Sequence, residues 1–260
     1  MRLPATAIVF LLLSVFPSHA LSEELRPVTH EDIWTMNRLG APVVDPSGEW
    51  AIVSVSEPSY EEDGDVSDLW LLRVDGSAEP RRLTATREGE SDVAWRPDGG
   101  AIAFAAKRGE DEASQVYVLD MTGPGEAVAV TALSTGAAKP LWSPDGSLIA
   151  FESRVYPGAL DDEQNQVEKE AREERKYHVS AYEMFPIRYW DPGRDDLQVH
   201  LFVQEARAGA QARDLLAGTE LVRQTGFAGA STLSGQTLNA AWAPDGASLV
   251  FNATTNLDEA

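Results

Sequence analysis

The sequence predicts an all-β protein built from repeated units of antiparallel strands, and three observations support this prediction. A turn unit occurs as WRPDGGAIAF from Trp95, WSPDGSLIAF from Trp142 and WAPDGASLVF from Trp242, with a looser copy, VDPSGEWAIV, from Val44. Two intervals between its prolines are about 50 residues long, and the third is about twice that. Each unit continues in short runs of alternating apolar residues, typical of half-buried strands. Together they predict a partial β-propeller of about three to four blades, with one helical and aromatic insertion.

The turn unit has a physical explanation. Proline presets φ at the first corner, aspartate accepts hydrogen bonds from nearby backbone N–H groups, and glycine adopts a positive φ. We therefore interpret these aspartates as turn residues rather than metal ligands or acids. The preceding tryptophan is large enough to wedge between blades. Second strands are expected from Asp68, Gln115 and Gln198, and third, shorter strands near Arg81, Val128 and Glu220.

The N-terminus carries the pattern of an export signal. Arg2 is followed by an almost unbroken apolar stretch from Ala5 to Phe16, and Ser18-His19-Ala20 offers small residues to a signal peptidase. We expect a signal peptide over 1–20, an N-terminal leader segment over 21–40 and an incomplete propeller over 41–260. An uncleaved anchor is the alternative, although the stretch is short for a membrane span. The prediction is a periplasmic or secreted protein with no membrane span after signal removal.

Composition limits the possible functions. The chain is 43% hydrophobic and 24% charged, as in ordinary globular proteins, and its formal net charge is -21. Such a surface repels a phosphate backbone, so we expect no nucleic-acid partner. The acidity indicates a solvated surface or, alternatively, an acidic cavity for cationic substrates. The absence of cysteine excludes disulfides, thiol catalysis and cysteine-ligated metals.

One blade carries an insertion, predicted over 155–196. The gap between two successive strands runs from Phe104 to Gln115 in one repeat, but from Phe151 to Gln198 in the next. The segment from Asp161 to Lys176 is rich in charged residues and predicts an exposed helix. The following MFPIRYWDPG combines aromatics with two prolines and cannot be helical throughout.

Two interpretations of this insertion remain open. It is either a solvated helix with an aromatic plug over the propeller edge, or a lid that contacts substrate. In the second interpretation Glu173 and Glu174 meet a substrate amine, and Arg188 and Asp191 form a bonded pair that orders the arm. These four residues are the candidate substrate contacts.

Motifs for covalent or metal chemistry are absent from the sequence. It contains no G-x-S-x-G elbow, no H-E-x-x-H and no phosphate-binding G-x-x-x-x-G-K. The histidines, His19, His30, His178 and His200, form no nucleophile–base–acid set with a serine. The acidic loop from Glu57 to Asp68 lacks the spacing of a calcium hand and is interpreted as a solvated hairpin loop, with calcium as the alternative. We therefore predict no catalytic residue, no metal site and no cofactor.

Several stretches together resemble one enzyme family. The leader VTHEDIWTMNRLGAPVVDPSGEWAIVSVS, the Trp-x-Pro-Asp-Gly units and the insertion ending FPIRYWD before QVHLFVQ resemble the prolyl oligopeptidase family of serine peptidases. The likeness is to its secreted acylaminoacyl-peptidase and dipeptidyl-peptidase members, and it covers nearly all of the mature chain. The turn motif alone is shared with TolB-like propellers. The resemblance implies an N-terminal propeller of seven or eight blades followed by an α/β-hydrolase domain that carries Ser, Asp and His.

No catalytic residue is carried over from the resemblance, because the family's motif has no matching position here. The paired glutamates that bind the substrate amine in some dipeptidyl-peptidases precede a blade tryptophan, and the matching stretch here, STGAAKPLW, has none.

The expected function is that of the propeller portion of a secreted serine exopeptidase. It would gate and help bind short peptides, and be non-catalytic as it stands because the α/β-hydrolase domain is absent. The alternative is a stand-alone periplasmic TolB-like propeller that binds a protein or peptide partner. A metal or nucleotide enzyme is a third interpretation, which no visible ligand set supports. No pattern predicts an oligomeric state.

Overall fold

The computed structural model describes residues 26–59, 64–86, 89–177, 179, 195–232 and 235–256. The predicted signal peptide lies outside these residues. The chain forms two compact units, Met1–Trp34 and Thr35–Ala260.

The described part of the first unit contains a short helix, α1 (His30–Trp34). Its first turn is closed by reciprocal hydrogen bonds: the Asp32 N–H donates to Thr29 Oγ1 at 3.2 Å, and the Thr29 N–H donates to Asp32 Oδ2 at 2.7 Å. The Arg26 guanidinium binds the same carboxylate and lowers the pKa of Asp32 below its ordinary value. The helix N-terminus is therefore capped within its own segment.

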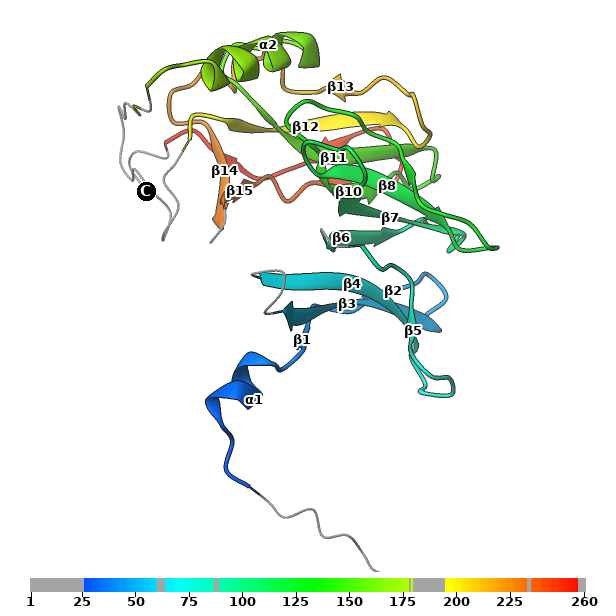
Figure 1. Ribbon diagram of the computed structural model, residues 1–260. Helices are drawn as coiled ribbons and strands as arrows, with labels where there is room; N and C mark the ends of the chain where they lie inside the picture. The colour runs from blue at the N-terminus through cyan, green and yellow to red at the C-terminus, as the bar shows by residue number, and fades with distance from the viewer. Residues whose placement is uncertain are drawn as a thin grey trace, which may run out of the picture. The chain divides into compact units, whose positions relative to one another are not determined.

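The second unit consists of four blades of antiparallel strands that follow one another in sequence order as a β-propeller (Figure 1). This confirms the predicted fold. The first blade has strand order β1-β3-β4-β5, with β2 also paired to β3. Its strands are β1 (Arg38–Leu39), β2 (Val43–Val44), β3 (Trp50–Ser59), β4 (Gly64–Arg73) and β5 (Arg81–Arg82).

The second and third blades share one four-stranded pattern in which each strand pairs with the next. The second contains β6 (Glu90–Trp95), β7 (Ala101–Ala106), β8 (Gln115–Asp120) and β9 (Val128–Ala129). The third contains β10 (Ala138–Trp142), β11 (Leu148–Val155), β12 (Gln198–Glu205) and β13 (Arg213–Asp214). The long connection from β11 to β12 is the predicted insertion.

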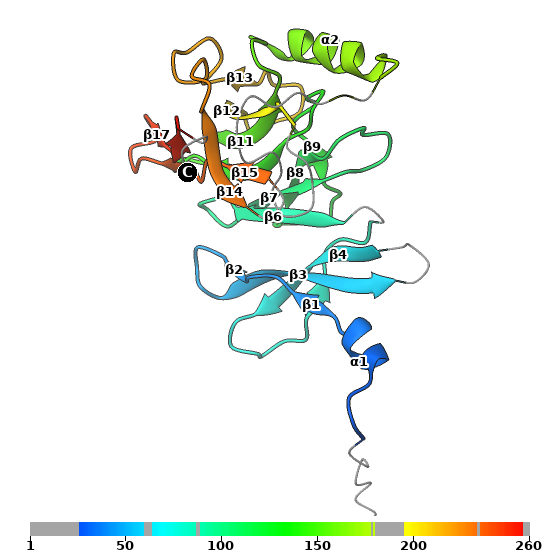
Figure 2. The ribbon, with the colours of Figure 1, turned by 90° about the vertical axis from the view of Figure 1, so that its left-hand side faces the viewer.

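The fourth blade is more broken than the others (Figure 2). One sheet has the order β15-β14-β18, from β15 (Gly235–Thr237), β14 (Ala228–Thr232) and β18 (Ala253–Thr254), and a second sheet pairs β16 (Ala241–Trp242) with β17 (Leu249–Val250).

The prediction of a third short strand near Glu220 is wrong. The outer strand of the third blade is β13, and the residues from Glu220 form turns. The Asp214 carboxylate accepts the backbone N–H groups of Leu216 and Ala217, which turns the chain away from the sheet immediately after β13. Leu221 and Val222 then pack onto the core between blades three and four.

The Pro-Asp-Gly turns adopt the predicted geometry. In the third blade the Gly146 N–H donates to the Ser143 carbonyl at 2.8 Å, and Gly146 has φ +70°. The Asp145 carboxylate accepts from the Ser147 N–H at 3.1 Å. Each aspartate therefore acts within its own turn, as predicted.

Apolar side chains fill the spaces between successive blades. Ile52, Leu69 and Phe104 lie between the first and second blades, and Ile149, Phe151 and Phe202 take part in the cluster between the second and third. Full burial of a side chain of this size contributes roughly 1.5–3 kcal/mol. These clusters hold neighbouring sheets together.

The repeat tryptophans join neighbouring blades in a further, regular way. The Trp95 Nε1 donates to the Val43 carbonyl at 3.0 Å, Trp142 Nε1 to Ala94 at 3.1 Å and Trp242 Nε1 to Leu141 at 3.1 Å. Each acceptor directly precedes the equivalent position of the preceding blade. The predicted wedge is confirmed, and each wedge is also a hydrogen-bond donor.

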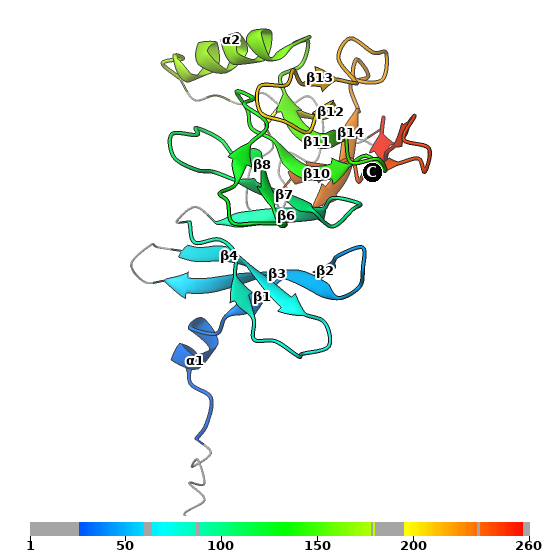
Figure 3. The same ribbon diagram turned by 90° about the vertical axis from the view of Figure 1, so that its right-hand side faces the viewer.

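The insertion begins with α2 (Asp162–Glu173), as the charged segment predicts, and Figure 3 shows this helix along the β13 side of the third blade. Asp161 caps it by accepting from the Gln164 N–H at 2.9 Å. The predicted aromatic segment MFPIRYWDPG lies outside the described residues, which resume at Asp195 just before β12.

Candidate functional site

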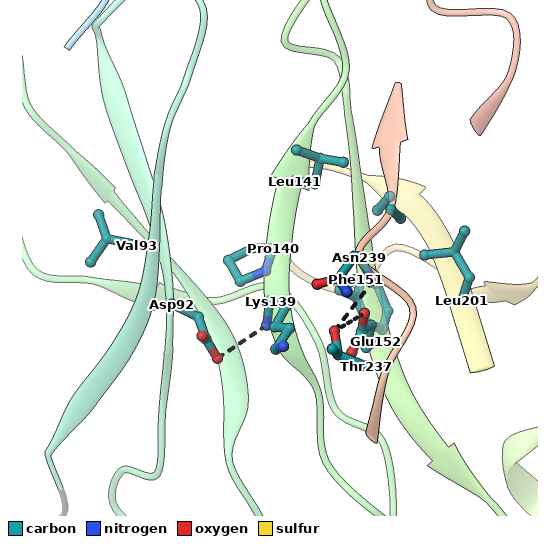
Figure 4. Close-up of a pocket in the computed structure, with 12 residues that line it drawn as sticks. Asp92, Val93, Lys139, Pro140, Leu141, Phe151, Glu152, Leu201, Thr237 and Asn239 are labelled. Atoms are coloured by element: carbon teal, nitrogen blue, oxygen red, sulfur yellow. Dashed lines mark hydrogen bonds between the residues drawn. The ribbon is translucent and has the colours of Figure 1, made fainter. Parts of the chain in front are cut away.

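A pocket of about 250 Å³ opens where the first strands of the second, third and fourth blades approach one another (Figure 4). The first strands of neighbouring blades are in contact, β2 with β6 and β6 with β10. β6 contributes Asp92 to the pocket wall, β10 contributes Lys139 and Leu141, and β11 contributes Glu152. The fourth blade contributes Thr237, Asn239 and Ala240. The pocket is thus built by three successive repeats.

Three pocket residues occupy equivalent positions with an unusual backbone. Asp92, Lys139 and Asn239 each lie three residues before a repeat tryptophan, with φ values of 54°, 53° and 47°. They are the non-glycine residues with positive φ in the described part of the chain, and all three line this pocket. Such a backbone costs roughly 1–2 kcal/mol for a residue with a Cβ. In β6 and β10 it coincides with a break in strand register, a β-bulge.

Opposite charges are exposed at the second and third repeats. Asp92 Oδ2 accepts the Lys139 backbone N–H at 3.4 Å, and both side chains are exposed. The Lys139 ammonium makes no ion pair with any residue that the structure describes. It is therefore available to an anionic group.

Glu152 is a buried carboxylate in the pocket wall, with only 7% of its surface exposed. Its Oε1 accepts from Thr237 Oγ1 at 2.9 Å and from the Leu238 N–H at 2.8 Å, which ties the third blade to the fourth. Within the described ranges no Lys, Arg or His side chain lies at ion-pair distance from the Glu152 carboxylate. Glu90, the comparably buried glutamate of the second blade, is paired with Arg108 at 2.8 Å.

A second buried polar pair lies between the third and fourth blades. His200, 2% exposed, places Nδ1 2.6 Å from Asp214 Oδ2, and its Nε2 is buried without a hydrogen-bond partner. The Phe227 ring meets the imidazole edge-on, with the ring centroids 6.4 Å apart. No serine hydroxyl among the described residues bonds to this imidazole, and burial keeps substrate from it. The pair therefore acts within the packing of the third blade.

Two of the four predicted substrate contacts, Glu173 and Glu174, lie among the described residues, on the helix of the insertion. Glu173 ends α2, exposed, with Oε1 3.9 Å from Lys169 Nζ, and Glu174 is the C-cap. Neither lines the pocket. Arg188 and Asp191 lie outside the described residues, so the role of all four stays a prediction.

The helix of the insertion is anchored to the propeller by polar contacts. Asn165, 3% exposed, accepts the Tyr156 N–H at 2.8 Å and donates to Thr135 Oγ1 at 3.0 Å. Lys169 Nζ lies 2.8 Å from Glu112 Oε2 in the second blade, and this ammonium lowers the pKa of Glu112. The helix therefore bridges two blades.

The pocket offers charged and apolar groups to a small ligand. The described residues contain no group of three or more histidine, aspartate or glutamate side chains that could hold a metal ion. None of the helices described there is long and apolar enough to cross a membrane. The pocket instead combines an exposed ammonium, an exposed carboxylate and a buried carboxylate above an apolar floor.

Sequence reasoning missed the pocket residues, although one signal was present. A polar residue stands three positions before the tryptophan in each of the three strict repeats, and asparagine and aspartate tolerate positive φ better than other residues with a Cβ. The fixed offset could have identified Asp92, Lys139 and Asn239. Glu152 had no comparable signal, because its burial depends on the fourth blade.

Fold and pocket define a β-propeller with a polar site among its first strands. No protein-family model matches the chain. A segment of 82 residues is 30% identical to dipeptidyl-peptidase 5 of Porphyromonas gingivalis, covering 32% of this chain and 12% of that protein. Among solved structures, an acylaminoacyl peptidase in complex with Z-Gly-Gly-Phe-chloromethyl ketone is similar over 70% of this chain and 26% of that chain, with 13% identity and a TM-score of 0.50. TolB from Acinetobacter baumannii is similar over 83% of this chain and 37% of that chain, with 10% identity and a TM-score of 0.46.

The chain thus spans 12% of the curated relative and 26% of the solved peptidase chain. The predicted resemblance to a peptidase propeller is confirmed at the level of the fold.

Proposed function

We propose that this propeller is the peptide-binding part of an extracytoplasmic serine exopeptidase, and that it admits short peptides and holds them at the pocket among its first strands. The pocket is the observation that carries the proposal: three repeats place strained polar residues, opposite charges and an apolar floor around about 250 Å³. Pockets with a few placed polar groups on an apolar wall are the usual form of small-ligand sites. The 30% identity to a dipeptidyl-peptidase over 82 residues supports the peptide as ligand.

Bond cleavage in this proposal belongs to an α/β-hydrolase domain, which the 260-residue sequence does not contain. The propeller contributes selection by size and charge. Because the net charge is -21, a cationic or amine-bearing peptide is favoured over an anionic one.

Binding is tested by calorimetric titration of the full chain with peptides of two to ten residues and with a folded acidic protein. We expect the short peptides to bind and the folded protein not to bind. Ala240→Leu, which fills the pocket, should abolish peptide binding, whereas Ala247→Leu in the exposed turn of the fourth blade should leave it unchanged. Equal binding by both variants would show that the pocket is not the site.

The peptidase assignment is tested in the coding sequence after the Ala260 codon. An in-frame G-x-S-x-G followed by aspartate and histidine supports it. A stop codon at that point, together with a folded chain that binds a protein but no short peptide, would overturn it in favour of a stand-alone TolB-like binding propeller.

A further inference from the structure

We propose that the pocket is a zwitterion site, in which Glu152 binds the α-ammonium group and Lys139 the α-carboxylate of a free dipeptide. This inference rests on the proposed function and names the ligand class of its pocket: very short peptides with both ends uncapped. The groups that would recognise them come from neighbouring strands of the third blade.

The Lys139 ammonium and the Glu152 carboxylate belong to neighbouring strands of one sheet, but they do not pair with each other. Ala138 and Glu152 are Cα partners in the β10–β11 ladder, and Lys139 directly follows Ala138. Partners in such a ladder have Cα atoms roughly 5 Å apart, so a lysine next to one of them could reach the glutamate. No ion pair between Lys139 and Glu152 forms within the described residues. The β-bulge at Lys139 interrupts the regular alternation of the strand and leaves the two charges separately available.

Burial of Glu152 makes an incoming cation favourable. A carboxylate removed from water and left without a counter-ion is costly, and the two donors on its Oε1 offset only part of that cost. The protein supplies Arg108 to the similarly buried Glu90 but supplies no cation to Glu152 among the residues described. A ligand ammonium would fill this role, whereas a neutral group would not.

Size and the remaining wall restrict the ligand further. The volume, about 250 Å³, lies below the roughly 300–1,000 Å³ of pockets for drug-sized ligands. Leu141, Phe151 and Leu201 contribute apolar surface to the same wall. Asp92, exposed beside Lys139, disfavours a second anionic group. One or two small uncharged residues between free termini fit this combination.

The test is calorimetric titration of the full chain with Ala-Ala, N-acetyl-Ala-Ala and Ala-Ala-amide. Each capped peptide loses one charged group and should bind at least about tenfold more weakly than Ala-Ala, the loss typical of one charge-assisted hydrogen bond.

Two variants assign the ends of the ligand. Glu152→Gln keeps acceptor capacity for Thr237 and Leu238, and should abolish the preference for Ala-Ala over N-acetyl-Ala-Ala while leaving the preference over the amide. Lys139→Met should abolish the preference for Ala-Ala over Ala-Ala-amide while leaving the preference over N-acetyl-Ala-Ala. Lys176→Met, an exposed lysine of the insertion, is the matched control and should change neither preference. Circular dichroism establishes that the variants are folded.

The outcomes separate this inference from the proposed function. Equal binding of free and capped peptides overturns the zwitterion site but leaves short-peptide binding in place. If both variants keep both preferences, the peptide termini are recognised by other residues, and the zwitterion site is overturned in that case too. If no peptide of any length binds, the proposed function fails, and this inference fails with it.

Discussion

The indole N–H of Trp142 donates to the carbonyl oxygen of Ala94 in the neighbouring blade, at 3.1 Å. The same relationship recurs from Trp95 to Val43 and from Trp242 to Leu141, so an equivalent tryptophan hydrogen bond helps to set the spacing of the blades at each of these three junctions. Packing area alone would not give such a uniform spacing, because apolar contact is not directional. The pocket depends on this spacing, since its wall comes from three consecutive blades.

We expect Trp142→Phe to lower the free energy of unfolding by about 1–2 kcal/mol, because the variant loses the hydrogen bond and some packing. Trp142→Ala should cost about 3–5 kcal/mol, since the side chain is 6% exposed. Urea unfolding monitored by circular dichroism measures both. Trp50→Phe is the control, because that ring lies half-buried in the first blade under the Arg73 guanidinium. Equal losses for Trp50→Phe and Trp142→Phe would contradict a special role for the junction hydrogen bond.

The positive φ at Lys139 predicts an unusual order of substitutions. Lys139→Gly should stabilise the protein by up to about 1 kcal/mol, because glycine adopts this backbone without a steric cost. Lys139→Val should destabilise it by about 1–2 kcal/mol, because a β-branched side chain fits this region worst. Thermal unfolding of the two variants gives the comparison, with Lys176→Gly and Lys176→Val as the matched pair. If glycine is the less stable variant at position 139, the strained backbone is not present in solution.

The Asp145 turn predicts a pH effect in acid. Hydrogen bonds from the Ser143 hydroxyl, and then from the Ser147 N–H and hydroxyl, lower the pKa of Asp145 to about 2. A carboxylate whose pKa is lower in the folded state stabilises the fold above its unfolded pKa, and this contribution is lost as the pH falls toward the folded value. Between pH 4 and pH 2, Asp145→Asn should therefore weaken the dependence of the unfolding free energy on pH. Urea unfolding at several pH values measures this dependence.

The fourth blade offers the matched control for that experiment. Asp245 occupies the equivalent turn, but Ala243 and Ala247 stand where Ser143 and Ser147 provide hydroxyl donors. Asp245→Asn should change the acid slope less than Asp145→Asn does. An equal change in the two variants would mean that the serine hydroxyls are not the cause.

Asn165 predicts how the insertion is held. Replacement by alanine leaves the Tyr156 N–H without its acceptor and removes the donor to Thr135 and to the Arg154 carbonyl. We expect faster proteolytic cleavage within 155–196 and a loss of about 1–3 kcal/mol at most, because the polar groups left behind are near the surface. Limited proteolysis with mass spectrometry locates the cleavage. The control variant Gln166→Ala, on the exposed side of the same helix, should be cleaved at the wild-type rate. Cleavage of Asn165→Ala at that same rate would contradict the anchoring role of Asn165.

The sequence by itself determined the repeat and its chemistry. The turn at Asp145 and the strand at Gln198 follow from local rules: proline and glycine restrict the backbone within four residues, and apolar alternation marks a half-buried strand. The helix after Asp161 was equally predictable, because its cap and charge pattern lie in one short segment. These features need no partner from elsewhere in the chain.

Only the tertiary structure decided which residues share a site. Asp92, Lys139, Glu152 and Asn239 come from three successive repeats of the sequence and meet because the blades pack side by side. Thr237 and Leu238 of the next blade bury Glu152. The outer strand of the third blade lies at Arg213–Asp214 rather than near Glu220, and Asp214 bonds there to the Leu216 N–H and to His200. Burial and hydrogen bonding between distant segments are properties of packing. A pattern read along one chain cannot contain them.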